Sequence, residues 1–263
     1  MLEGVAARIQ HDHKPKNIGL LERYDTYFRS EKAGTADAIR RAFALRYQVG
    51  CLERGFEDVL PHDNGLKTDQ FDAQSDHGLV YYRPTEEAIG TARLILPTSG
   101  KSLPVMRLLR AMNIDPALHF LESQTAEVSR FAITNTFMRR GFEQADSMGD
   151  ADAENQYSSL PCLGLVQIIL ALSIEKGITH WAALMEPKLL RMLTMSGIRF
   201  TPIGPPIFHR GQRQLCFCNV PRMLSTLWYE RPSHWDVVTR GGALCYDWPQ
   251  LFGVSRQGWP GTR

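Results

Sequence analysis

Arginine side chains stand at positions where the surrounding pattern calls for apolar residues. Arg46 follows Ile39 by seven residues and precedes Val49 by three, so helical spacing places its guanidinium on the apolar face of a predicted helix. In a predicted strand further along the chain, Arg93 follows Ile89 by four residues. Since side chains of a strand alternate between its two faces, Arg93 shares the apolar face of Ile89. A single Arg of this kind can rest its stem on the core and keep its head in water. Recurrence on separate elements instead indicates buried, paired charges.

Two further charges lie in the predicted strand 125–134. Strict alternation places Glu127 on the same face as Phe131 and Ile133, and Arg130 on the opposite face. A buried charge without a partner costs several kcal/mol. Each of these charges therefore predicts an opposite charge nearby.

The acidic segment around Phe71 supplies the partners. Asp69 and Asp72 flank this aromatic residue, which can anchor the segment to the core. The predicted set contains three Arg and three carboxylates, namely Arg46, Arg93, Arg130, Asp69, Asp72 and Glu127. A carboxylate that faces a cleft can act as a general base, whereas a fully paired network can simply hold loops in place. We prefer the first interpretation and keep the second.

The composition limits the class of protein. A chain of 263 residues with 43% hydrophobic residues can bury a full core, which excludes disorder of the whole chain. The 30 Lys and Arg residues against 28 Asp and Glu leave a formal charge of +2, so we expect no nucleic-acid partner. Of the 30 cationic residues 7 are Lys, which leaves 23 Arg, the side chain that pairs with carboxylates and phosphates in a fixed forked geometry.

Cysteine usage and hydropathy bear on the compartment. The five Cys residues form neither a CxxC pair nor a zinc pattern with His, so we expect a reduced, cytoplasmic protein without a metal site. The N-terminus has no hydrophobic signal core, and the longest apolar run, residues 160–174, is too short to span a bilayer and contains Gln167.

The order of elements predicts an α/β (α+β) domain with a central mixed, twisted sheet flanked by helices. The expected order is strand, helix, hairpin, strand, helix, strand, helix, strand, strand, with the first strand at 23–29 and a late one at 198–203. We assign 1–20 to a flexible leader, 21–220 to the domain and 221–263 to a Trp- and Pro-rich extension. Packing of this extension on the domain is favoured over peripheral membrane contact through its Trp side chains.

Four motifs follow one another along the chain: Leu45-Arg46-Tyr47-Gln48-Val49, Thr68-Asp69-Gln70-Phe71-Asp72, Gly90-Thr91-Ala92-Arg93-Leu94 and Glu127-Val128-Ser129-Arg130-Phe131. In this order they resemble the acyl-homoserine-lactone (autoinducer) synthases, a branch of the GNAT superfamily. Three further segments are similar to N-acyl amino acid synthases and PEP-CTERM/exosortase-associated acyltransferases: 51–57, Met185-Glu186-Pro187 and Ile203-Gly204-Pro205. The resemblance covers roughly residues 36–210.

This resemblance implies a GNAT-like fold and transfer of an acyl group from an acyl carrier protein to a primary amine. The acyl carrier protein thioester would be the donor substrate, and no cofactor would be bound permanently. The implied residues are Glu127, Asp69, Arg93 and Arg130 for catalysis, with Glu127 and Asp69 as base candidates, Arg46, Asp72, Phe56 and Phe131 for substrate binding, and the backbone amides of Phe131 and Ile133 for the oxyanion.

Two departures from the autoinducer-synthase pattern concern the amine. Those enzymes usually carry an aromatic residue and a Trp near the S-adenosylmethionine pocket, where this chain has Gly50 and Phe56. We therefore prefer a free amino acid, whose carboxylate an Arg fork binds bidentately, and an N-acyl amino acid as product. Two alternatives are kept: an acyl-homoserine-lactone synthase that uses S-adenosylmethionine, and a non-catalytic module that senses acyl carriers or lipids.

The donor requires an apolar tunnel for its acyl tail, and an acidic carrier protein favours a basic rim. The expected tunnel walls are Leu163, Val166, Leu170, Trp181 and Leu184, and the expected rim is Arg139, Arg140, Lys188 and Arg191. Ordinary core and a solvated basic face are the alternatives for these two sets. The segment after residue 134 has one Gly, Gly141, instead of the Gly-rich turn that holds pyrophosphate in ordinary GNAT enzymes, which favours a carrier-protein donor over free coenzyme A.

Overall fold

The computed structural model describes residues 19–55, 64–115, 121–139, 151–209 and 211–245, without the side chains of 151–158. Two predicted site residues, Phe56 and Arg140, lie outside the described residues. The same holds for the predicted leader up to residue 18 and for the extension beyond residue 245.

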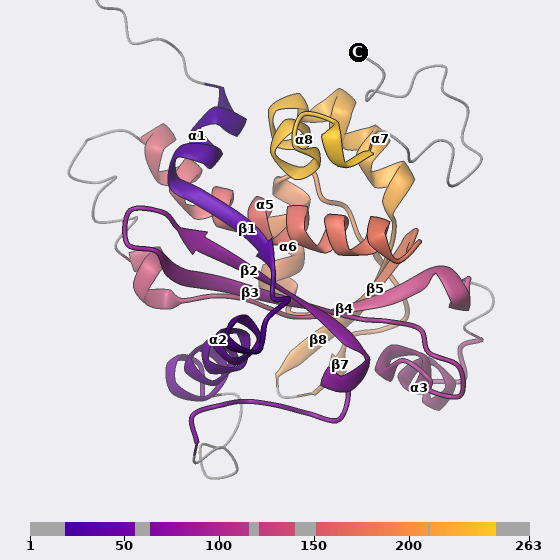
Figure 1. The fold of residues 1–263 in the computed structure, drawn as a ribbon. Coiled ribbons are helices and arrows are strands. Elements are labelled where there is room, and N and C mark those ends of the chain that lie inside the picture. The colour runs from indigo at the N-terminus through magenta and orange to yellow at the C-terminus, as the bar shows by residue number, and fades with distance from the viewer. Residues whose placement is uncertain (1–18, 56–63, 116–120, 140–150, 210, 246–263) are drawn as a thin grey trace, which may run out of the picture.

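A mixed sheet forms the centre of the described part of the chain (Figure 1). Its eight strands follow the order β1-β2-β3-β4-β5-β8-β6, with β7 paired to β8. Neighbouring strands are antiparallel except β4 and β5, which run parallel. The bounds are β1 Phe28–Lys32, β2 Ser75–Tyr82, β3 Glu87–Ile95, β4 Thr125–Ile133, β5 His180–Met185, β6 Thr201–Pro202, β7 Ile207–Phe208 and β8 Gln212–Asn219.

Helices cover both faces of the sheet (Figure 1). Helices α2 (Ala36–Tyr47) and α3 (Pro104–Ala111) lie on one face, and α5 (Ala151–Glu175) crosses the other. On the α5 side also lie α1 (Leu20–Tyr27), α6 (Pro187–Met195), α7 (Val220–Glu230) and α8 (Pro232–Thr239). The predicted fold class, a mixed sheet flanked by helices, is confirmed.

The prediction of a strand is wrong for two segments. Most of segment 23–29 belongs to α1, because Leu20 and Tyr24 recur at helical spacing and both pack against the core, which outweighs the short alternation that suggested a strand. Segment 198–203 contributes only the two residues of β6. Pro202 has no N–H group with which to extend the ladder.

Strands β4 and β5 pair only near their amino ends. Residues 125–127 lie opposite residues 180–182, and no strand pair between them follows in the described chain. Beyond Glu127 the two strands diverge, so the sheet opens toward the carboxyl ends of both. One edge of β4 continues to pair with β3 as far as Ile133, whereas its other edge faces the opening.

A bulge in β4 changes the direction of its side chains. Thr91 lies opposite Ala132 and Arg93 opposite Ser129, so Arg130 and Phe131 together oppose a single residue of β3. Arg130 adopts a φ of 53°, which is uncommon for a residue other than Gly. The strict alternation predicted for this strand is therefore wrong, and Arg130 reaches the same acidic segment as Arg93.

The described part of the C-terminal extension, residues 221–245, packs over the α5 face. Leu224, Leu227 and Trp235 belong to the main core, and the Trp228 ring lies edge-on to Trp235 with ring centroids 4.6 Å apart. Within the described ranges, none of the helices combines the length and the apolar composition needed to cross a membrane.

We expect Gly164→Ala to destabilise the fold. A Cβ at this position of α5 would lie 2.9 Å from ring carbons of Tyr24, which is fully buried and donates or accepts a 2.6 Å hydrogen bond with Ser30. Overpacking of this kind costs about 1–3 kcal/mol, measurable by urea unfolding. The matched control is Gly34→Ala, where an added Cβ meets no atom within 4 Å. Equal stability of the two variants would contradict this packing.

Candidate active site

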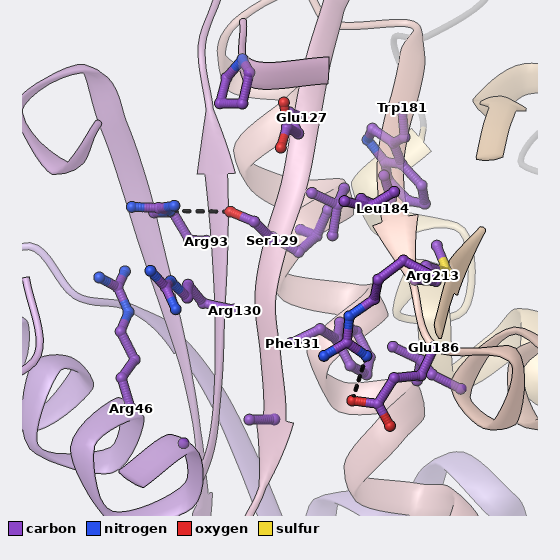
Figure 2. Close-up of a pocket in the computed structure, with 18 of the residues that line it drawn as sticks. Arg46, Arg93, Glu127, Ser129, Arg130, Phe131, Trp181, Leu184, Glu186 and Arg213 are labelled. Atoms are coloured by element: carbon purple, nitrogen blue, oxygen red, sulfur yellow. Dashed lines mark hydrogen bonds and ion pairs between the residues drawn. The ribbon is translucent and has the colours of Figure 1, made fainter. Parts of the chain in front are cut away.

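Two aspartates ahead of β2 bind three arginines from three elements. Asp72 Oδ1 accepts hydrogen bonds from Arg46 Nη1 at 2.7 Å and Arg93 Nη1 at 2.8 Å. Asp69 accepts from Arg93 Nη1 at 2.6 Å and Arg130 Nη2 at 2.9 Å. Figure 2 shows the three guanidiniums gathered on one side of β4. The structure thus brings together five of the six charges predicted as a set.

The two aspartates are held ionised by these neighbours. Burial opposes ionisation of Asp69, but the hydrogen bonds and charge of Arg93, with a further hydrogen bond from Arg130, outweigh it and keep its pKa well below the usual range. Burial likewise opposes ionisation of Asp72, and Arg46 outweighs it, which again lowers the pKa. A carboxylate with a strongly lowered pKa is a weak base, so the structure argues against Asp69 as the base candidate.

His77 was not singled out by the sequence, yet it completes the network. Its Nδ1 accepts a hydrogen bond from Arg46 Nη2 at 2.6 Å, because a guanidinium can only donate. Burial and the charge of Arg46 lower the pKa of His77 to about 4, so the ring is neutral at pH 7. It lies opposite Arg93 in the β2–β3 register, a pairing across strands that the sequence alone does not reveal.

Glu127 stands apart from the ion pairs. Its Oε2 accepts a hydrogen bond from the backbone N–H of Val105, at the start of α3, at 2.8 Å. The residue is 6% exposed, and burial raises its pKa to about 7, against the lowering effects of the Val105 hydrogen bond and Arg93. Glu127 forms no ion pair with any described residue. The prediction that three carboxylates balance three arginines is therefore wrong for Glu127.

A cavity of about 340 Å³ passes through the gap between β4 and β5. On the α2 side its walls include Arg46, Asp69, Arg93 and Glu127. On the α5 side they are apolar: Val166, Ile169, Trp181, Leu193 and Phe200. The two halves have opposite chemistry because the diverging strands connect the charged face of the sheet with its apolar face.

The predicted tunnel residues divide into two groups. Val166, Trp181 and Leu184 line the cavity, and the Trp181 indole N–H donates to Ser173 Oγ at 2.8 Å, which fixes its ring. Leu163 and Leu170 are fully buried in the core and are not among the lining residues. Their position on α5 explains the difference, since α5 is apolar around most of its circumference and only one stripe faces the gap.

The predicted oxyanion and rim residues lie toward the wide end of the gap. Phe131 lines the cavity, whereas Ile133 is buried outside it. Arg139 follows the end of β4, and Lys188 and Arg191 follow the end of β5, all exposed. Parallel strands end at the same edge of a sheet, so these cations lie at the same edge as the cavity's wide end.

Several cavity residues were missed by the sequence analysis. Arg54, Glu186 and Arg213 line the wide end, and Lys67 is buried beside Gly50, whose missing side chain leaves room for the Lys67 ammonium 2.7 Å from where a Cβ would lie. These residues are far apart in sequence, and although Arg54 and Glu186 lie in segments that carry the resemblance, 51–57 and Met185-Glu186-Pro187, the sequence assigned neither of them a role. Within the described ranges, no group of three or more His, Cys, Asp or Glu side chains could hold a metal ion.

Comparisons with known proteins agree with this architecture. Residues 45–145 match the model of an acetyltransferase (GNAT) domain. No curated protein matches the chain. Among solved structures it is similar to TofI in a ternary complex with an inhibitor and MTA, at 16% identity over 83% of this chain and 100% of TofI, with a TM-score of 0.57.

Two further solved structures are similar. BjaI, a coenzyme A-dependent acyl-homoserine lactone synthase with MTA, shares 19% identity over 81% of this chain and 88% of its own, with a TM-score of 0.51. FeeM, an N-acyl amino acid synthase from uncultured soil microbes, shares 19% identity over 76% of this chain and 94% of FeeM, with a TM-score of 0.47. Residues 45–145 thus match a GNAT domain, and TofI and BjaI share the fold of the chain, which confirms the predicted resemblance.

We expect Glu127→Gln to change how stability depends on pH. The pKa of Glu127 is about 7 in the folded chain against an ordinary value of 4.5, so the wild type loses stability as pH rises through this range. The variant does not lose stability in this way, because Gln has no carboxyl group to titrate. Its free energy of unfolding relative to wild type should therefore rise between pH 4.5 and 7 by roughly 3 kcal/mol and then level off.

Urea unfolding at several pH values measures this difference, in which the titration of His77 cancels because both proteins contain it. Glu122→Gln is the control, since the Glu122 side chain is 61% exposed in a surface pair with Arg110. A pH-independent difference between wild type and Glu127→Gln would refute the raised pKa.

Proposed function

We propose that this GNAT-type acyltransferase moves a fatty acyl group from an acyl carrier protein thioester to the amino group of an amino acid, giving an N-acyl amino acid. The observation that carries the proposal is the cavity through the β4–β5 gap, which joins a charged half beside Glu127 to an apolar half under α5. A polar amine and a lipid thioester can enter from opposite faces and meet between the strands.

The charge of the cavity supports an amino acid as acceptor. Its cationic lining residues are Arg46, Arg54, Lys67, Arg93, Arg130 and Arg213, and the carboxylates among its described lining residues are Asp69, Glu127 and Glu186. A cationic wall attracts a carboxylate and can bind it through Arg forks. S-adenosylmethionine carries an additional sulfonium cation, which the same field disfavours.

The apolar half supports a fatty acyl donor. Each methylene that leaves water for such a wall contributes about 0.8 kcal/mol, so affinity rises with chain length until the space is filled. A carrier protein as the source of the thioester is supported by the exposed cations Arg139, Lys188 and Arg191 near the wide end, since such proteins are acidic.

Glu127 has the properties of the base. With a pKa of about 7 it is partly ionised at neutral pH and lines the cavity. It takes one proton from the substrate ammonium, directly or through a water molecule. The free amine then attacks the thioester carbonyl, so that a C–N bond forms and the C–S bond breaks. The second nitrogen proton passes to the departing thiolate. Main-chain N–H groups on the edge of β4 that faces the gap can stabilise the tetrahedral oxyanion.

The direct test is an acceptor and donor screen. Purified protein, acyl carrier protein loaded with long-chain acyl groups and a panel of amino acids should yield N-acyl amino acids, detected by mass spectrometry. A parallel arm supplies S-adenosylmethionine. Release of methylthioadenosine with an acyl-homoserine lactone would replace the proposal with the synthase alternative, and absence of product with every amine would favour the non-catalytic one.

Glu127→Gln should reduce kcat/KM about 10²–10⁴-fold, because loss of a general base removes a contribution of that size. The wild type should gain rate as pH rises through about 7, where Glu127 ionises, and this step should be absent from the variant. Glu122→Gln is again the control. A variant that retains the step near pH 7 would show that another group supplies it.

A further inference from the structure

A buried lysine stands in the wall of the cavity. Lys67 is 3% exposed, and it lines the cavity together with Arg46 and Asp69. Its backbone N–H donates to the carbonyl of Phe43 on α2 at 3.1 Å, which ties it to the helix that carries Arg46. Lysine is rarely buried to this degree, because its ammonium must keep hydrogen-bond acceptors around it. A lysine in this wall is therefore a candidate for binding an anion that enters the cavity.

The chain makes room for this ammonium at Gly50, in the π-helical turn Gln48–Glu53 that follows α2. A Cβ on Gly50 would lie 2.7 Å from Lys67 Nζ, and the next nearest described atoms, at 3.8 Å, are also atoms of the Lys67 side chain. Gly50 is not among the glycines with a positive φ, so its backbone conformation is open to other residues. The space taken by the ammonium is thus the structural reason for a glycine here. Turns of the π type often occur at functional sites.

The three arginines of the charged half serve the chain's own carboxylates. Arg46, Arg93 and Arg130 all donate to the two aspartates of the network, and these contacts fix the directions of their planar guanidiniums. The Lys67 ammonium instead has three donors on a flexible stem. It can therefore bind the carboxylate of a ligand in addition to acceptors of the chain itself.

We infer that Lys67 binds the carboxylate of the acceptor amino acid and so determines that the acceptor is an amino acid and not a simple amine. The inference rests on the proposed function for the nature of the acceptor. Glu127 lines the same cavity and takes the proton from the amino end, so each charged end of the acceptor has a partner of opposite charge. Gly50 is a positioning residue, because it determines where the ammonium lies.

The test compares acceptors with and without the carboxylate. The amino acids of the acceptor panel and their amides are assayed with wild type and with Lys67→Met, which keeps an unbranched side chain and removes the charge. For the amino acid that gives product, the ratio of KM for the amide to KM for the amino acid should fall about 10- to 100-fold from wild type to Lys67→Met. The amide also has a less basic amine, but that difference is the same for both proteins and cancels.

Gly50→Ala tests how the ammonium is positioned. The added Cβ displaces Lys67 Nζ, so KM for the amino acid should rise while KM for the amide stays unchanged. In the Lys67→Met background the same substitution should leave the ratio of the two KM values unchanged, because Gly50 acts through the lysine. Lys176→Met, in a partly exposed cluster with Glu175 and Asp76, is the matched control and should keep the wild-type ratio.

Binding is measured independently of turnover. Isothermal titration of wild type with each amino acid of the panel and its amide should give at least one amino acid a tighter Kd than its amide, and Lys67→Met should remove that preference. Thermal unfolding of each variant verifies that it is folded.

Equal losses for the amino acid and its amide in Lys67→Met would show a structural role for the lysine and overturn the inference. Equal affinity of wild type for the two members of every pair of titrants would overturn it as well. Absence of product with every amine would count against the proposed function alone, since the titrations do not depend on turnover.

Discussion

Arg93 is the residue on which the geometry of the cavity depends. Its guanidinium binds Asp69 and Asp72, and its Nε donates to Ser129 Oγ on the neighbouring strand at 2.9 Å. Through the two aspartates it is connected to Arg46 on α2 and to Arg130 in the bulge of β4. One cation that is 3% exposed thus holds a helix, an irregular segment and two strands in a fixed relation.

Carboxylate side chains behave in two ways in this site. Asp69 and Asp72 are surrounded by arginines, which outweigh the effect of burial and keep both carboxylates ionised. Glu127 is more deeply buried, and its hydrogen bond from Val105 compensates only part of the cost of charge. Environment therefore separates structural carboxylates from one that can exchange a proton near neutral pH. The ion network borders the same cavity as Glu127, so the structural interpretation describes the paired aspartates and the catalytic interpretation stays a proposal for Glu127.

Much of this arrangement could be predicted from the sequence, because misplaced charges are visible in a periodic pattern. Arg46 and Arg93 each interrupt an apolar face, and the acidic segment stands out by composition. The bulge at Arg130 could not be predicted, because alternation assumes a regular strand and a bulge depends on pairing with β3. His77 and Arg213 also escaped detection, since their roles come from contacts across strands that are distant in sequence. Segment 23–29 was misjudged because a short alternation cannot be distinguished from one side of a helix without the residues before it.

The short pairing between β4 and β5 also has a mechanical consequence. Residues 125–127 and 180–182 are the seam between two sub-sheets, β1–β4 and β5–β8. The ladders of the first sub-sheet and the ladder between β5 and β8 are longer, and α5 packs against β1, β2, β3 and β4 of the first. A small rotation about the seam would change the width of the cavity while leaving these longer ladders intact. Because Glu127 lies at this seam and lines the cavity, the width of the gap and the surroundings of this buried carboxylate are set by the same three residue pairs.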